Sequence, residues 1–78
     1  MDEDAILAEL GRRIRAQRKA AGLTQEQLAL VAGLDRSYCG SVERGERNIT
    51  FTVLCRLAAA SDCDVAALTA GLPFPIKG

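Results

Sequence analysis

Three cysteines and a central group of basic side chains are the residues of this 78-residue chain that could do chemistry. Cys39, Cys55 and Cys63 lie 16 and 8 positions apart, form no Cys-x-x-Cys pair, and have no histidine in the chain to complete a zinc site or a cysteine–histidine nucleophile. A glycine-rich phosphate loop is also absent from the sequence. We therefore expect packed, reduced thiols, no metal, no cofactor and no enzymatic activity.

The basic side chains are concentrated in the middle of the chain, although ten Lys and Arg balance ten Asp and Glu overall. Residues 1–9 carry four acidic side chains and no basic one, whereas residues 10–56 carry nine basic and four acidic side chains, a net charge of +5 (nine minus four). Such a basic centre can attract phosphate groups, or it can be an ordinary solvated helix surface. The zero net charge therefore does not exclude nucleic acid as a partner.

Helices are the elements that would position these side chains. The sequence contains one pattern typical of a helix start four times. Thr24, Asp35, Thr50 and Asp64 each follow an apolar residue and precede another one four positions later, as an N-cap with a hydrophobic staple does. Gln27 completes a capping box with Thr24. Glycines then follow the expected helices where a left-handed cap is wanted; these are Gly33, Gly45 and Gly71.

A longer helix precedes these four, because Leu7, Leu10, Ile14 and Ala21 share one face at helical spacing. The sequence thus predicts an all-α fold of five helices in one domain over residues 1–71, with a proline-containing tail over 72–78. The expected helices lie near residues 4–21, 25–32, 36–44, 51–61 and 65–70.

Membrane and export signals are missing from the sequence. No apolar run approaches the roughly 18 residues of a membrane span, and the N-terminus is acidic where a signal peptide is basic. We expect a cytoplasmic protein with no membrane partner. Because so short a chain buries only about 60–65% of its unfolded surface, we also expect marginal stability and a benefit from a second subunit.

The segment from Leu28 to Val42 has the spacing of two helices that cross steeply after a short turn. Ala29 is small where the helices would approach each other, and Gly33 suits the turn. The inward face would consist of Leu28, Ala32, Leu34, Cys39 and Val42. These offsets are typical of a helix-turn-helix motif, but chains rich in Ala and Leu also produce them by chance.

The sequence resembles the lambda-repressor-like (Cro/C1, XRE) helix-turn-helix family over about residues 8–68. The matching residues are Arg13-Ile14-Arg15, Arg18, Gly22 to Ala29, Ala32 to Leu34, Ser37-Tyr38, and Val42 to Gly45. More narrowly, Leu34 to Tyr38 and Val42 to Thr50 look like the controller proteins of restriction-modification systems. The resemblance implies a sequence-specific DNA-binding transcriptional regulator. A phage-type repressor or antitoxin is the nearest alternative, and a protein-interaction module without DNA binding is an alternative of another class.

The resemblance also implies roles for individual residues. The helix near 36–44 would read base edges in the major groove of double-stranded DNA through Arg36, Ser37, Tyr38 and Ser41. Phosphate contacts would come from Thr24, Gln25, Arg47 and Asn48. Arg18 and Glu43 would form an ion pair that orients the recognition helix. The alternatives are solvated side chains for Arg36 and Arg47, capping support for Gln25 and core packing for Tyr38.

A homodimer on a palindromic operator is expected, because one recognition helix makes few base contacts and the chain has no long basic arm. The controller-like family implies an interface on the last two helices. Its candidates here are Ile49, Phe51, Thr52, Val65 and Leu68, with Leu72 as a further one; they could instead close the monomer core. RNA polymerase is a further candidate partner.

Four positions depart from the family pattern and predict an underfilled core. Cys39 is smaller than the usual aliphatic residue, and Gly40 lies inside an expected helix at a cost of about 1 kcal/mol relative to Ala. Gln17 and Ser61 stand where apolar side chains are expected.

Overall fold

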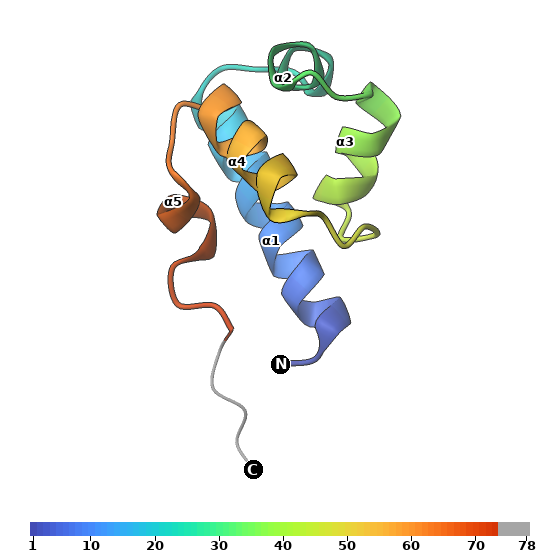
Figure 1. Cartoon of the computed structure of the whole chain (residues 1–78), viewed down its shortest axis with the longest axis vertical. Coiled ribbons are helices and arrows are strands. Elements are labelled where there is room, and N and C mark those ends of the chain that lie inside the picture. Colours follow the sequence, from blue (N-terminus) through green and yellow to red (C-terminus); the bar gives the residue numbers. More distant parts are fainter. Residues whose placement is uncertain (74–78) are drawn as a thin grey trace.

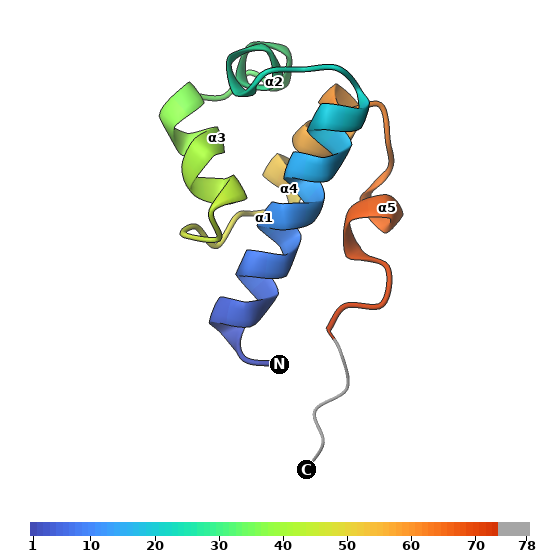
Figure 2. The ribbon, with the colours of Figure 1, turned by 180° about the vertical axis from the view of Figure 1, so that it is seen from behind.

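The computed structural model describes residues 1–73, and these form five α-helices without any strand (Figures 1 and 2). The helices are α1 (Glu3–Ala20), α2 (Gln25–Ala32), α3 (Arg36–Glu43), α4 (Phe51–Ala60) and α5 (Val65–Thr69). The predicted all-α fold is confirmed, with every boundary within one residue of the expectation. Residues 74–78 of the expected tail lie outside the described residues. Within residues 1–73, no helix is both long enough and apolar enough to span a membrane.

Each helix begins at a side chain that accepts a hydrogen bond from a backbone N–H of the first turn. The four predicted caps are confirmed, with N···O distances of 3.1, 3.1, 3.2 and 2.9 Å at Thr24, Asp35, Thr50 and Asp64. Asp2 caps α1 in the same way, at 2.8 Å from the amide of Ala5. These caps satisfy amides that have no partner within the helix, so short helices can begin at defined residues.

The hydrophobic core is one cluster to which all five helices contribute. Its buried members are Ile14, Leu28, Ala29, Ala32, Cys39, Val42, Leu54, Leu57, Ala58 and Leu68. The four residues that precede the caps pack against this cluster, as the staple pattern predicts. Ala21 was expected on the inward face of α1, but it is exposed because the helix ends at Ala20. Arg18 is buried on this helix instead.

The helix α1 is the central element, with α3 on one side and α5 on the other (Figure 1). α2 lies across one end of the molecule and packs against α3 and α4. The crossing of α1 and α3 is close, since a Cβ atom at Gly11 would lie 2.5 Å from the carbonyl oxygens of Val42 and Glu43. Any larger residue at this position would push the two helices apart, so Gly11 sets how closely α3 is held to the domain.

Candidate nucleic-acid interface

The turn between α2 and α3 fixes how the two helices cross. Gly33 ends α2 with φ of +70°, and the amide of Leu34 bonds back to the carbonyl of Ala29 at 2.8 Å. Asp35 then caps α3, so the three connecting residues are all used to end one helix or to begin the next. The predicted helix-turn-helix geometry is therefore present, and each residue of its turn has a defined structural role.

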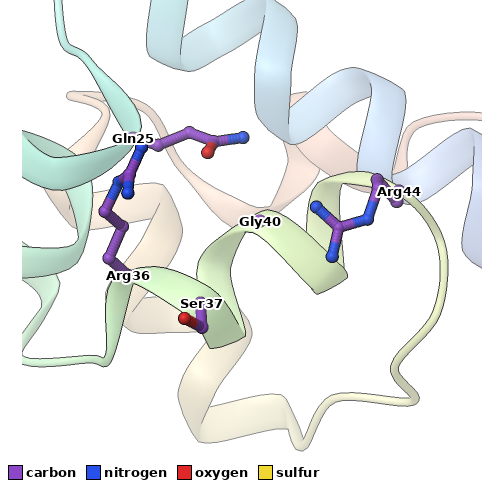
Figure 3. Close-up of a pocket in the computed structure, with 5 residues that line it drawn as sticks. All are labelled: Gln25, Arg36, Ser37, Gly40 and Arg44. Atoms are coloured by element: carbon purple, nitrogen blue, oxygen red, sulfur yellow. The ribbon is translucent and has the colours of Figure 1, made fainter.

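The N-terminal turn of α3 presents polar side chains beside the start of α2. Arg36 and Ser37 are exposed, whereas Tyr38 is half-buried and packs against the core cluster. Arg36 and Ser37 line a polar pocket of about 240 Å³ together with Gln25, Gly40 and Arg44 (Figure 3). The pocket thus brings together Arg36, which was predicted to read bases, and Gln25, which was predicted to contact a phosphate. It also includes Arg44, which the sequence reasoning did not select.

Ser41 does not belong to this exposed surface. It is only 6% exposed, and its hydroxyl donates to the carbonyl of Tyr38 at 2.7 Å. The same hydroxyl accepts from Nε of Arg47 at 3.4 Å, and the Arg47 guanidinium lies 6.0 Å from the centre of the Tyr38 ring. Its burial contradicts the prediction that Ser41 reaches base edges. Ser41 and Tyr38 instead hold Arg47 at the edge of α3.

The predicted ion pair between Arg18 and Glu43 is present and buried. Nε and Nη2 of Arg18 lie 2.7 and 3.1 Å from the two carboxylate oxygens, and the side chains are 9% and 2% exposed. Nη1 of Arg18 also donates to the carbonyl of Leu23 at 2.8 Å. Nε2 of Gln25 donates to Glu43 at 3.1 Å. This network ties α1, the end of α3 and the start of α2 together, and the second N–H of Gln25 stays available for an external acceptor.

The other two candidate phosphate ligands lie in different surroundings. Thr24 is exposed next to the first amides of α2, and its own side chain is engaged in the capping box. Asn48 is exposed after α3 and lines a pocket of about 280 Å³ with Glu3, Asp4 and two apolar residues of α1. The acidic first turn of α1 disfavours an anion at Asn48.

The three cysteines are free thiols, as expected. Burial raises the pKa of the Cys39 thiol, and the negative charges of Glu43 and Asp35 add to the shift. Burial likewise raises the pKa of Cys63, with Asp64 and Asp62 as further causes. These two thiols therefore stay protonated and unreactive at neutral pH. Among residues 1–73, no group of three or more His, Cys, Asp or Glu side chains could hold a metal ion.

The candidate interface residues on the last two helices are not all on the surface. Phe51 is 69% exposed and Thr52 is exposed, whereas Ile49 and Val65 are half-buried against the core. Leu68 is 1% exposed, so it belongs to the monomer core, and its assignment to an interface is wrong. Two further exposed apolar residues lie on α2 and were not predicted; they are Leu30 and Val31, 80% and 63% exposed.

Comparisons with known proteins give one consistent result. The sequence model of a family described as helix-turn-helix matches residues 14–68. The control protein C.SmaI of Serratia marcescens is 48% identical over 68 residues, which are 87% of this chain and 77% of C.SmaI. The restriction-modification controller protein C.AhdI from Aeromonas hydrophila is 48% identical with a TM-score of 0.80, over 82% of this chain and 97% of that one. The controller C.Esp1396I, solved as a tetramer with its natural 35-base-pair operator, is 30% identical with a TM-score of 0.75, over 81% and 83%.

Proposed function

Because this chain belongs to the helix-turn-helix family of XRE (Cro/C1) type, we propose that it binds a palindromic operator as a homodimer and controls restriction-modification genes. Members of this family are DNA-binding transcriptional regulators and not enzymes. Sequence-specific binding of DNA is the property of the family. The homodimer, the palindrome and the controlled genes are the proposal, supported by the similarity to controller proteins. A contact with RNA polymerase stays a prediction.

One observation carries the proposal, namely the exposed Arg36 and Ser37 at the start of α3 beside Gln25 at the start of α2. The N-terminal turn of a recognition helix is the part that reaches base edges in the major groove. An arginine there can donate two hydrogen bonds to O6 and N7 of guanine, while Gln25 and Arg47 contact phosphates and set the register. The bonds of Glu43 to Arg18 and Gln25 link the end of α3 to α1 and to the start of α2, which supports the proposal.

A second copy supplies the contacts that one recognition helix lacks. Two-fold pairing places two such helices about 34 Å apart, one turn of DNA, on a palindrome. Phe51 is the best anchor for the pairing, because it is 69% exposed at the start of α4 and next to the exposed Thr52. Ile49 and Val65 contribute the exposed parts of their half-buried side chains.

The DNA-binding proposal is tested by selecting sequences from a random duplex pool and measuring affinity for the selected duplex over a salt series. Arg36→Ala should relax specificity at one base pair by about 1–3 kcal/mol, whereas Arg47→Ala should weaken binding to all sequences alike. Arg12→Ala is the matched control, because Arg12 is exposed on α1 away from the α2–α3 pocket. A pool that yields no enriched palindrome would overturn the proposal.

The homodimer is tested by analytical ultracentrifugation. The wild-type protein should sediment as a dimer of twice the 8.3 kDa chain mass, and Phe51→Glu should sediment as a monomer, because a buried charge at the pairing face has no partner. Leu30→Glu is the control, since Leu30 is equally apolar and 80% exposed but lies on α2. A dimer that dissociates in Leu30→Glu and not in Phe51→Glu would show that the interface lies on α2.

A further inference from the structure

Arg44 and Glu46 form an exposed ion pair beside the pocket between α2 and α3. Nε and Nη2 of Arg44 donate to the two carboxylate oxygens at 3.0 and 3.2 Å, and the side chains are 60% and 55% exposed. The hydrogen bonds from Arg44 hold the pKa of the Glu46 carboxyl below its usual value. Glu46 therefore carries a full negative charge at neutral pH, on the surface for which DNA is proposed.

The end of α3 fixes Glu46 in this position. The amide of Gly45 bonds to the carbonyl of Val42 at 3.0 Å, and the amide of Glu46 bonds to the carbonyl of Ser41 at 2.9 Å. These two bonds close the helix around Gly45, which has φ of +76°. The backbone of Glu46 is thus held one turn beyond α3, where its side chain meets Arg44.

The remaining edge of the Arg44 guanidinium faces the pocket. Nη1 of Arg44 lies 3.1 Å from the place that a Cβ atom at Gly40 would occupy, and Oε1 of Gln25 lies 3.5 Å from the same place. Nη1 is not engaged by Glu46, so its N–H groups are available over Gly40, at the opposite end of the pocket from Arg36 (Figure 3). The pocket lining thus offers guanidinium, amide and hydroxyl donors, and the Arg44 guanidinium at one end of the pocket is suited to a phosphate group.

We propose, on the basis of the proposed function, that this pocket seats one phosphate of the DNA backbone on Arg44, and that Glu46 competes with that phosphate for the guanidinium. A bound phosphate would share one cation with the Glu46 carboxylate, so the two anions repel each other or one displaces the other. Glu46 thereby limits affinity for DNA of any sequence and leaves discrimination to the base contacts.

The charge of the surrounding segment strengthens this inference. Residues 24–48, which span α2, α3 and the loop after them, carry three basic and four acidic side chains, a net charge of −1 (three minus four). Glu43 is neutralised by Arg18 from α1, and Asp35 caps α3. Arg44 is one of only three basic residues in the segment, so its neutralisation by Glu46 removes a large share of the local attraction for phosphate.

The test measures binding of a fluorescein-labelled 30-base-pair duplex of random sequence by anisotropy over a salt series. Glu46→Gln should bind about two- to fivefold more tightly at low salt, the strength of an exposed ion pair. Its plot of log affinity against log salt should be steeper by up to about 0.9 per protomer, because the phosphate contact of Arg44 then forms without competition from Glu46. Arg44→Gln should bind more weakly than wild type, and adding Glu46→Gln to it should bring no gain.

Asp62→Asn is the matched control for the loss of one negative charge. Asp62 is exposed in the connection between α4 and α5. This connection lies on the other side of α1 from α3 (Figures 1 and 2). Asparagine also tolerates the φ of +57° at this position. Circular dichroism of each variant checks that it is folded. A gain in Glu46→Gln no larger than in Asp62→Asn, or a gain that persists without Arg44, would overturn the inference. Wild-type protein that binds no duplex would overturn the proposed function, and this inference with it.

Discussion

The helix-turn-helix half of the molecule (α1–α3) and its C-terminal half (α4 and α5) differ in whether their buried polar side chains are hydrogen-bonded. In the first half, the buried polar groups are bonded: Arg18 and Glu43 pair with each other, and Ser41 bonds to Tyr38 and Arg47. In the second half, the buried hydroxyl of Ser61 has no hydrogen-bond partner among the described residues. Phe51 is the large apolar side chain that the C-terminal half exposes.

This difference matches two kinds of binding. Hydrogen bonds and ion pairs are directional, so a bonded network holds α2 and α3 at the angle that base recognition demands. Apolar burial has no preferred direction, which would suit the proposed role of Phe51 in bringing two copies together. The comparison teaches that hydrogen bonds specify the geometry of the first half, whereas apolar packing specifies that of the second.

Arg18→Met should give the largest effect, because it leaves the Glu43 carboxylate buried without its partner. The free energy of unfolding should fall by about 3–5 kcal/mol. Urea denaturation followed by circular dichroism measures the loss. Glu43→Gln in the same protein should recover part of it, since the unpaired charge is then removed.

The control for this prediction is Arg15→Met, which removes an exposed arginine from the same helix. It should change stability by less than about 0.5 kcal/mol, as surface substitutions usually do. Equal losses in the two variants would show that the buried network is not what holds the helix-turn-helix half together.

Ser61→Ala and Ser41→Ala should change stability in opposite directions, although both serines are buried, at 4% and 6% exposed. Ser61→Ala removes an unsatisfied hydroxyl and should raise the free energy of unfolding by about 1–2 kcal/mol. Ser41→Ala removes two hydrogen bonds and should lower it by about 1 kcal/mol. Thermal or urea unfolding of the two variants measures both changes in the free energy of unfolding. Changes of the same sign would contradict the difference between the two halves.

Gly40→Ala should separate stability from binding within the helix-turn-helix half. Alanine favours the helix by up to about 1 kcal/mol, and the new Cβ would meet the movable end of Arg44 at 3.1 Å and the Gln25 side chain at an ordinary contact distance of 3.5 Å. Stability should therefore rise slightly while affinity for duplex DNA falls, because Arg44 is pushed from the pocket. Unfolding curves and duplex titrations of one preparation measure both quantities.

Gly11→Ala is the contrasting control, because its Cβ would meet backbone oxygens of α3 at 2.5 Å. Backbone cannot move aside as a side chain can, so this variant should lose stability in spite of the better helix propensity. A Gly40→Ala protein with unchanged DNA affinity would show that the pocket does not contact DNA.

The helices were predictable because their signals are local. A cap and its staple lie within six residues, so Thr24 or Asp64 could be recognised without knowing what packs against the helix. Burial of Ser41 and Leu68 depends on how the folded chain packs around them, and the family resemblance that placed both on a surface does not contain this information. Gly11 was missed for the same reason, because only the crossing of α1 with α3 gives it a role.

The charge pattern was predictable in sum but not in its distribution. The net charge of +5 over residues 10–56 comes mainly from α1, where Arg12 and Arg13 pair with Glu9, and Arg18 is buried. The pair between Arg44 and Glu46 joins positions two apart across a helix end, which no helical spacing rule selects. The proposed DNA surface is thus less basic than the sequence implied.

Arg13 makes the short α5 dependent on α1. Its Nη1 donates to the carbonyl of Ala70 at 2.6 Å, just past the end of the helix, while its Nε bonds to Glu9. A five-residue helix has no stability of its own, so α5 depends on the burial of Leu68 in the core and on this bond from Arg13. Backbone amides of α5 should therefore exchange with solvent in one cooperative unit with α1. If the proposed homodimer forms through the C-terminal half, its stability is then linked to the folding of α1, against which α5 is held.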